Sequence, residues 1–320
     1  MSWALRWYFI IPMENKFVLT VVGRDRPGIV ATVSNVLAGF HANIIKARAS
    51  TILTNLFVLI MVVDTTHATM KRRALINILK RSCDDTGLAL AVESADSYKC
   101  EKRVIVFDLD GTLIEQEVIE ELARAAGVFD KVSKITALAM EGKTDFSLAL
   151  KERVALLKGL PIAKMDQVRH SINIFPGVTD LVKRLKEEGF VVGIVTGGFD
   201  FVADHVGEMV GADYVFSNKL GIRNGQLTGE VEGEITGPEA KFRAIKQIAE
   251  ERGVGLGSCV AVGDGANDLL MMENVGLGVG FKAKLVVREK ASALISTDDL
   301  NVLLALIGCI DLKVDVMNRI

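Results

Sequence analysis

The sequence contains few of the features that mark several large protein classes. Only five of its 320 residues are proline, which excludes collagen-like and proline-rich segments. Its net charge of −2 gives no strong positive field to neutralise phosphates, so we expect no nucleic-acid partner. The apolar stretch near the start, residues 7–12, is far shorter than the roughly 20 residues that cross a bilayer, so no membrane partner is expected. Half of the residues are hydrophobic, which excludes intrinsic disorder.

Cysteine is also scarce, and its spacing carries no motif. The four cysteines lie far apart and form no CxxC pair: Cys83, Cys100, Cys259 and Cys309. Neither a disulfide framework nor a zinc site is expected, and a reducing, cytoplasmic location fits. No small-residue cleavage site follows residues 7–12, so we expect no signal peptide, and Met13 is an alternative start of translation.

The length and the charge distribution both indicate two domains. About 150 residues per domain predicts two for this chain. Residues 1–100 contain 12 Lys and Arg with 7 Asp and Glu, whereas residues 101–320 contain 26 and 33. The charge balance therefore changes sign near residue 100, next to the short polar stretch 94–102, which is typical of a linker. Removal of residues 1–95 should leave a soluble domain.

The first unit, residues 16–95, has the pattern of a ferredoxin-like βαββαβ fold. Apolar, β-branched runs predict strands at 17–23, 43–50, 56–63 and 88–92, and helical spacing predicts helices at 29–40 and 68–83. Residues 23–44 (GRDRPGIVATVSNVLAGFHANI) resemble an ACT domain, a regulatory module of amino-acid metabolism.

The ACT resemblance implies an amino-acid effector bound where two copies meet. The matching positions are Asp25, Gly28 and Asn43, and a loop that leads into a helix N-terminus offers free N–H groups to a carboxylate. Alternatively, the loop is only a tight turn and the unit only dimerises. Because a single ferredoxin-like unit leaves an apolar face or a sheet edge to cover, we expect a homodimer or larger homo-oligomer.

The second unit, residues 103–320, reads as an α/β domain with a Rossmann-like parallel sheet. Apolar runs without polar alternation at 104–107, 191–195, 259–262 and 276–280 are typical of strands covered on both faces. Between about 115 and 173 the pattern is helical without a convincing strand. That insert, placed after the first strand, predicts a helical cap over the edge of the sheet.

Polar residues follow three of these buried strands. They are Asp108-Leu109-Asp110-Gly111-Thr112, Thr196-Gly197-Gly198, and Gly263-Asp264-Gly265-Ala266-Asn267-Asp268. Because ligands bind at the carboxyl ends of the strands in such sheets, the three clusters should converge. Several aspartates at one edge would repel each other without a cation, and hard oxygen ligands favour Mg²⁺.

The DLDGT and GDGAND motifs together resemble the haloacid dehalogenase superfamily of aspartate-based phosphotransferases. The resemblance implies Asp108 as nucleophile and Asp110 as general acid and base. It implies Mg²⁺ held by Asp108, Asp110 (through its backbone carbonyl) and Asp264, with the phosphoryl group bound by three further positions: Thr196, Gly197 and Lys241. Asp268 would orient the lysine.

Within the superfamily, residues 141–161, 196–200 and 227–234 resemble the phosphoserine phosphatases. The resemblance implies that Glu117 binds the substrate ammonium, that Arg153 binds its carboxylate, and that Asn267 helps to hold the substrate. Met140 and Phe146 match apolar cap positions that shield the site. Thr196 stands where this family usually has serine, a change that keeps the hydroxyl.

Two alternatives remain open at this point. The enzyme could act on another small phosphomonoester or transfer the phosphoryl group to another acceptor. In a different class, the chain could be an amino-acid-sensing regulator with a vestigial phosphatase domain. Intact Asp108, Asp110, Lys241 and Asp264 argue against the vestigial reading.

Overall fold

The computed structural model describes residues 15–52 and 55–309. Residues 7–12 and Met13 lie outside this part, so the expectations for them stay predictions. None of the described helices combines the length and the apolar character that a membrane crossing requires. All four cysteines lie in the described part and are free.

The first unit has the predicted βαββαβ order. Its elements are β1 (Lys16–Arg24), α1 (Ile29–Gly39), β2 (Asn43–Ile52), β3 (Leu56–Asp64), α2 (Arg72–Asp84) and β4 (Ala89–Ser94). Alternate residues of β1 face opposite sides: Leu19 packs with the helices α1 and α2, whereas Val18 and Val22 belong to the core on the other side. The second face is covered within the chain, because α13 (Val302–Leu306) and α3 (Ala95–Lys99) pack against it.

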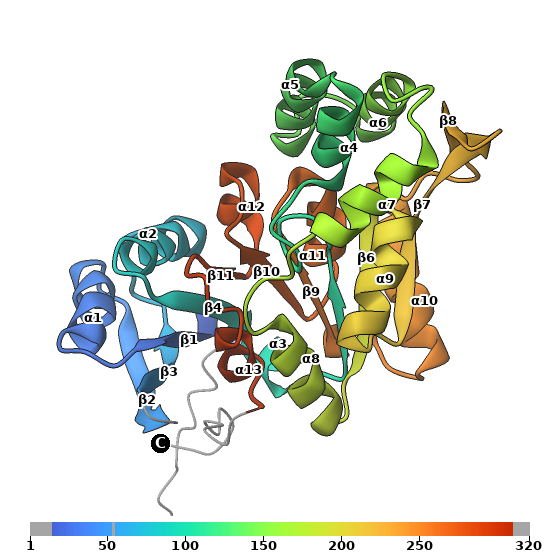
Figure 1. The fold of residues 1–320 in the computed structure, drawn as a ribbon. Helices are drawn as coiled ribbons and strands as arrows, with labels where there is room; N and C mark the ends of the chain where they lie inside the picture. Colours follow the sequence, from blue (N-terminus) through green and yellow to red (C-terminus); the bar gives the residue numbers. More distant parts are fainter. Residues whose placement is uncertain (1–14, 53–54, 310–320) are drawn as a thin grey trace, which may run out of the picture.

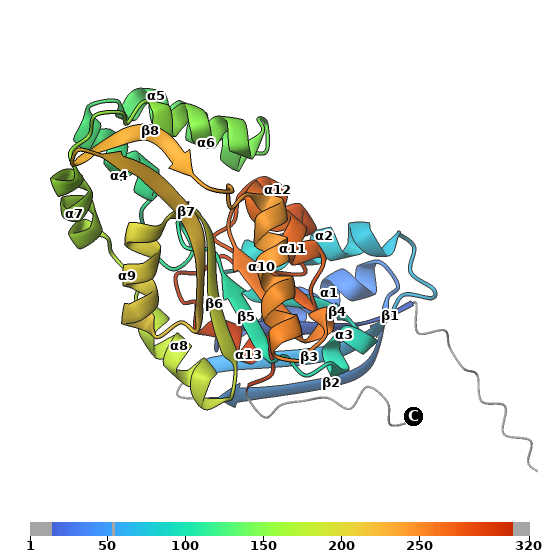
Figure 2. The ribbon, with the colours of Figure 1, turned by 90° about the vertical axis from the view of Figure 1, so that its right-hand side faces the viewer.

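The second unit contains the predicted sheet, which is parallel except for β8 at its edge. Its strands are β5 (Val104–Phe107), β6 (Val191–Phe199), β7 (Tyr214–Arg223), β8 (Gln226–Glu232), β9 (Cys259–Gly263), β10 (Leu277–Phe281) and β11 (Ala293–Ile295). Helices α8 (Val178–Glu187) and α9 (Asp200–Val210) cover one face, and α10 (Pro238–Glu251), α11 (Leu269–Glu273) and α12 (Leu285–Lys290) cover the other (Figure 2). Ile105 and Phe107 therefore lie in one core and Val104 and Val106 in the other, and all four are fully buried.

Four helices fill the stretch predicted to form a cap. They are α4 (Val118–Ala126), α5 (Phe129–Met140), α6 (Phe146–Ala155) and α7 (Ile162–Ser171). Figure 1 shows α4, α5 and α6 above β6 and β9. The antiparallel hairpin of β7 and β8 was missing from the prediction, and it supports the cap: a Cβ on Gly229 would lie 2.9 Å from Lys158 Cβ, just after α6. The sequence of β7 lacks the uninterrupted apolar run that revealed β5, β6, β9 and β10.

The two units share one sheet of eleven strands, in the order β2-β3-β1-β4-β11-β10-β9-β5-β6-β7-β8. The junction is an antiparallel pairing in which Leu90 and Ala91 of β4 lie opposite Leu294 and Ala293 of β11. The expected linker is likewise structured, because α3 lies within it. Lys102, at its end, is buried and lies 3.2 Å from Glu93. The fold class is as predicted. The two units are joined by strand pairing within one sheet, which the polar stretch between them did not predict.

Candidate active site

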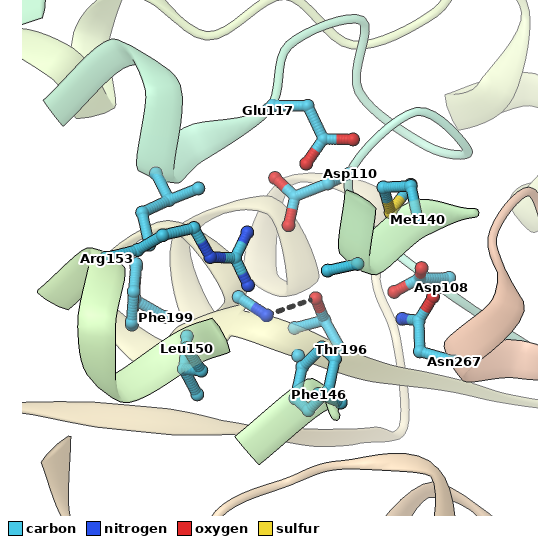
Figure 3. A pocket seen from close by; sticks show the side chains of 14 residues that line it. Asp108, Asp110, Glu117, Met140, Phe146, Leu150, Arg153, Thr196, Phe199 and Asn267 are labelled. Atoms are coloured by element: carbon cyan, nitrogen blue, oxygen red, sulfur yellow. Dashed lines mark hydrogen bonds between the residues drawn. The ribbon is translucent and has the colours of Figure 1, made fainter. Parts of the chain in front are cut away.

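The predicted strand-end clusters converge at one edge of the sheet. Strands β9, β5 and β6 are neighbours and run parallel, so their carboxyl ends lie side by side. Asp108 follows β5, Asp264 follows β9, and Thr196 lies near the end of β6. Together with residues of the cap, these strand ends form the walls of a single pocket (Figure 3).

Three buried aspartates and one buried lysine lie close together at these strand ends. Asp108, Asp264 and Asp268 each offer a carboxylate oxygen within 4.8 Å of the others. The Nζ atom of Lys241, in the first turn of α10, lies 2.7 Å from Asp108 Oδ1 and 2.7 Å from Asp268 Oδ1. The lysine side chain is fully buried, so the two carboxylates are its charge partners in place of water.

The electrostatics of the cluster indicate a need for more positive charge. Burial, followed by the charges of Glu117 and the two other aspartates, raises the pKa of Asp264 well above its ordinary value. Burial and Asp108 raise the pKa of Asp268 to about 7. Burial alone would lower the pKa of Lys241, but the charges of Asp108 and Asp268 outweigh it and raise that pKa. Lys241, together with the half-exposed Lys284 at 3.9 Å from Asp264, therefore does not balance three buried carboxylates.

The donor set fits a small divalent cation. Among the described residues, the buried Asp264 Oδ1 has no hydrogen-bond partner, which is the expected state of a ligand atom without its metal. Asp268 is already engaged, because its Oδ1 accepts from Lys241 and its Oδ2 accepts from the N–H groups of Asp264 and Gly265. Asp108 and Asp264 are thus the carboxylates with free ligand capacity, and oxygen donors favour Mg²⁺.

Asp110 lies apart from this cluster and faces the pocket. Its Oδ1 accepts a hydrogen bond of 3.0 Å from the N–H of Val118, at the start of α4. Burial and the charge of Asp108 raise its pKa to about 7. Gly198 permits its approach to β6, since a Cβ there would lie 2.6 Å from Asp110 Oδ2. Any other residue at 198 would displace this carboxyl group.

The cap contributes two opposite charges to the pocket wall. Glu117 precedes α4, and burial, Asp110 and Asp108 together raise its pKa to about 8. Arg153 lies on α6 and is only 5% exposed, and its burial lowers the pKa of the guanidinium. Figure 3 shows the two side chains projecting into the pocket together with Asp110. The structure therefore brings these two sequence-predicted residues to the same site.

The phosphoryl-binding candidates are held by backbone contacts. Thr196 Oγ1 accepts a hydrogen bond of 2.8 Å from the N–H of Gly198, which leaves the hydroxyl proton free to be donated (Figure 3). Asn218, on β7, donates from Nδ2 to the carbonyl of Gly197 at 2.9 Å and accepts from the N–H of Thr236 at 2.7 Å. This buried amide keeps the loop after Thr196 in place.

The cap closes tightly over the pocket. A Cβ on Gly197 would lie 2.5 Å from Phe146 Cζ, and a Cβ on Gly265 would lie 3.0 Å from Met140 Cε. Both apolar cap residues thus contact the loops that carry the polar groups. The buried Asn267 Oδ1 also faces this region and has no partner in the described part of the chain. The pocket between the cap and the strand ends is narrow, with a volume of about 40 Å³.

The effector candidates of the first unit do not all come together within one chain. Gly28 ends the loop before α1 with φ of 95°, and Asp25 Oδ2 accepts a hydrogen bond from Thr51 at 3.1 Å. Asn43 begins β2 eight residues before Thr51, which places it roughly 26 Å along the strand at 3.3 Å per residue. Asp25 and Gly28 therefore border one end of α1, and Asn43 lies at the other.

Three residues of the site were missing from the prediction. Thr136, on α5, accepts a hydrogen bond from Arg153, and Asn218 supports Gly197. Lys284 Nζ lies 3.9 Å from Asp264 Oδ2, and the Lys284 N–H donates to the Asp264 carbonyl at 2.9 Å. Only Thr136 left a signal in the sequence, because it lies one helical turn before Met140 and thus on the same face of a helix.

Comparisons with known proteins agree with this geometry. A model of the haloacid dehalogenase-like hydrolases matches residues 105–273, and one of the ACT domain matches residues 15–93. A phosphoserine phosphatase from Archaeoglobus fulgidus is 40% identical over 289 residues, which cover 90% of this chain and 83% of that protein. One from Methanocaldococcus jannaschii is 45% identical over 203 residues, which cover 63% of this chain and 96% of that protein.

Solved structures show the same relationship. A haloacid dehalogenase family hydrolase from Salmonella enterica serovar Typhi matches with a TM-score of 0.75 at 26% identity, over 92% of this chain and 98% of that one. A phosphoserine phosphatase solved as a phospho-aspartyl intermediate analogue matches with a TM-score of 0.63 at 44% identity, over 64% of this chain and 99% of that one. The chain therefore belongs to the haloacid dehalogenase-like hydrolase family, and it joins that hydrolase domain to an ACT domain.

Proposed function

We propose that this protein is a phosphoserine phosphatase, which hydrolyses O-phospho-L-serine to serine and phosphate with the help of Mg²⁺. The main support for this proposal is that one pocket combines groups suited to a phosphoryl group with groups suited to an amino acid. A nucleophile and a lysine suited to a phosphoryl group lie at the strand ends, and Arg153 and Glu117 face them from the cap. A zwitterion that carries a phosphate matches this arrangement.

The first step is attack of Asp108 on phosphorus. Two contacts on Oδ1, from the Leu109 N–H and from Lys241, fix the orientation of this carboxylate for the attack. The new bond gives an aspartyl-phosphate, and the bond between phosphorus and the serine oxygen breaks. Thr196, the Gly197 N–H and Lys241 stabilise the phosphoryl oxygens as their charge grows.

Asp110 handles the protons in both steps. With its pKa raised to about 7, a large fraction of the carboxyl groups is protonated near neutral pH and can protonate the departing serine oxygen. The resulting carboxylate then accepts a proton from the water that attacks the aspartyl-phosphate. Phosphate leaves, and Asp108 and Asp110 return to their starting forms.

The metal site follows from the donor atoms described above. Asp108, Asp264 and the backbone carbonyl of Asp110 would hold Mg²⁺, and the bound ion would offset the charge between the nucleophile and the phosphoryl oxygens. Lys241 holds Asp108 in place through a contact of 2.7 Å, and Asp268 orients Lys241. Asn267, whose Oδ1 is unpartnered among the described residues, would help to hold the substrate.

A phosphate-release assay tests the proposal. The purified protein is given phosphoserine, phosphoethanolamine and an aryl phosphate, each with Mg²⁺ and with a chelator. We expect the highest kcat/KM for phosphoserine and no turnover without Mg²⁺. Preference for another phosphomonoester would contradict the substrate, and the absence of all turnover would favour a vestigial domain.

Metal binding has a test that does not depend on activity. Mg²⁺ should raise the melting temperature of the wild type, because a ligand that binds only the folded state stabilises it. The Asp264→Asn variant should lose this response, whereas Lys284→Gln, which leaves the carboxylates intact, should keep it. An equal response of Asp264→Asn and the wild type would contradict the assigned ligand.

For the rest of the chain we propose residues 16–95 as a regulatory and dimerising domain and residues 103–320 as the phosphatase domain, with its cap at about 115–173.

A groove of about 450 Å³ beside Gly28, lined by Arg26 and Ser34, supports an amino-acid effector there. The outer edge of β2, the last strand of the sheet, supports a homodimer. Light scattering and calorimetric titration with amino acids test the two proposals, and a cytoplasmic location stays a prediction.

A further inference from the structure

Thr136 contacts the side chain that we assign to the substrate carboxylate. It lies on α5, is 3% exposed, and its Oγ1 accepts a hydrogen bond of 3.0 Å from Arg153 Nη1. Arg153 lies on the next helix, α6, so this contact crosses between two cap helices. A buried hydroxyl on an otherwise apolar helix face costs free energy unless it forms a hydrogen bond. Here that hydrogen bond is with the guanidinium of Arg153.

The hydrogen bonds of Arg153 show what this contact leaves free. Its Nε donates to the carbonyl of Ala149, one turn earlier in α6, at 3.1 Å. With the bond to Thr136, two of the five guanidinium N–H groups are used. The remaining N–H groups, on Nη1 and Nη2, are those available to a ligand in the pocket that Arg153 lines.

Two anchor points fix the plane of the guanidinium. The bond to Ala149 holds the near end of the side chain against its own helix, and Thr136 holds the far end from a neighbouring helix. A bidentate bond to a carboxylate requires both groups to be nearly coplanar, so a free guanidinium would lose rotamer entropy on binding. Because the plane of the guanidinium is already fixed, its free N–H groups have the orientation that a bidentate bond to a ligand carboxylate requires.

We propose that Thr136 is a positioning residue that sets the preference for substrates bearing a carboxylate, acting through Arg153. This inference rests on the proposed function, since it assigns Arg153 to the carboxylate of phosphoserine. Thr136 itself stays away from the reacting atoms, which Asp108, Asp110 and Lys241 supply. Its loss should therefore weaken substrate binding without changing the phosphoryl chemistry.

The test compares Thr136→Val with Thr136→Ser on two substrates. Valine keeps the shape and removes the acceptor, whereas serine keeps the hydroxyl. For Thr136→Val we expect kcat/KM for phosphoserine to fall about tenfold, mostly through a higher KM, with less than a twofold change for phosphoethanolamine, which lacks the carboxylate. Thr136→Ser should stay within about threefold of the wild type on both substrates. Ser133→Ala, on the same helix, is the control for loss of a cap hydroxyl.

A double-mutant cycle separates positioning from a structural role. In an Arg153→Ala background, Thr136→Val should cause no further loss of kcat/KM for phosphoserine, because Thr136 acts through the Arg153 side chain that this background lacks. If Thr136→Val melts too early to assay, Thr136→Ala gives the same comparison, and melting curves of all variants accompany the kinetics. Equal losses on both substrates, or a further loss in the Arg153→Ala background, would overturn the inference.

The proposed function and the inference can fail separately. A wild type that prefers phosphoserine, together with a Thr136→Val variant that keeps this preference in full, overturns the role of Thr136 alone. A wild type that hydrolyses phosphoethanolamine as well as phosphoserine overturns both, because there is then no carboxylate preference to set.

Discussion

Lys241 and Asp268 form an ion pair that is fully closed to solvent. Their Nζ and Oδ1 atoms are 2.7 Å apart, and neither side chain is exposed. The second oxygen of Asp268 accepts from the backbone at Asp264 and Gly265, so one carboxylate joins α10 to the loop after β9. This pair therefore carries both stability and the orientation of the lysine at the nucleophile.

Breaking this pair should cost far more than breaking a pair on the surface. Asp268→Asn leaves Lys241 with one charge partner, and we expect the free energy of unfolding to fall by about 3 kcal/mol, as for other buried pairs that lose one partner. Glu250→Gln, which removes the exposed partner of Lys246 3.8 Å away, should cost less than about 1 kcal/mol. Urea unfolding followed by circular dichroism measures both. Similar losses in the two variants would contradict the structural role of the buried pair.

The nucleophile has a direct test. Asp108→Asn keeps the shape of the side chain and removes the attacking anion, so kcat on phosphoserine should fall by several orders of magnitude while the protein stays folded. Phosphate release and the melting temperature are measured on the same preparation. Retention of more than about a tenth of the wild-type turnover would exclude Asp108, because a tenfold loss is only about 1.4 kcal/mol of barrier.

Arg153 should decide between substrates rather than drive the chemistry. Losing a charge-assisted contact to a carboxylate in a closed site costs roughly 2–5 kcal/mol, so Arg153→Ala should lower kcat/KM for phosphoserine by at least about 30-fold. Phosphoethanolamine, which keeps the ammonium and lacks the carboxylate, should lose little. Steady-state kinetics on both substrates check this. An equal loss on both would assign Arg153 to the fold or to the phosphate.

Glu117 should give the metal-free protein a dependence of stability on pH. Its pKa, about 8 in the folded protein, lies above the ordinary value of 4.5. The folded state therefore binds the proton more tightly, and this contribution to stability is full below about pH 4.5 and is lost as the pH rises to about 8. Asp110, with a pKa of about 7, acts in the same direction.

Removing this carboxylate should therefore stabilise the protein at alkaline pH. At pH 8 and without metal, we expect Glu117→Gln to melt roughly 3 °C above the wild type, the effect of about 1 kcal/mol in a domain of this size. At pH 4 the two should melt together, and kcat/KM for phosphoserine should be lower in the variant. Glu115→Gln, an exposed carboxylate two residues earlier that does not act on Glu117, is the control. A variant that melts below the wild type at pH 8 would show that the ionised carboxylate of Glu117 does not destabilise the folded protein.

The shared sheet changes what we expect from a truncated chain. The sequence alone predicted that removal of residues 1–95 leaves a soluble domain. The Methanocaldococcus jannaschii relative is in line with this prediction, because the match covers 96% of that protein but only 63% of this chain. Here, however, removal exposes the edge of β11 and the apolar side chains of α13, including Leu303 and Leu304. We expect a 101–320 fragment to associate and to melt below the full chain. Light scattering that shows a monomer, with an unchanged melting temperature, would contradict this.

The catalytic edge could be predicted because its residues follow short apolar runs. Asp108 and Asp264 each come directly after a buried strand, and the order of such strands in parallel sheets brings their ends together. Strand β11 could not be found in this way, because its three residues are too few to show a pattern. For Thr136 the sequence offers only its helical spacing from Met140, because its contact with Arg153 depends on how α5 packs on α6.

The packing of Phe146 against Gly197 makes the shape of the pocket depend on a residue without a side chain. A Cβ at position 197 would lie 2.5 Å from Phe146 Cζ and 3.1 Å from Phe146 Cε2, both atoms of the ring. Any substitution there would push the ring, and with it the start of α6, away from the strand that carries Thr196. A single methyl group at position 197 would thus change the contact between the cap and the sheet without touching a charged group.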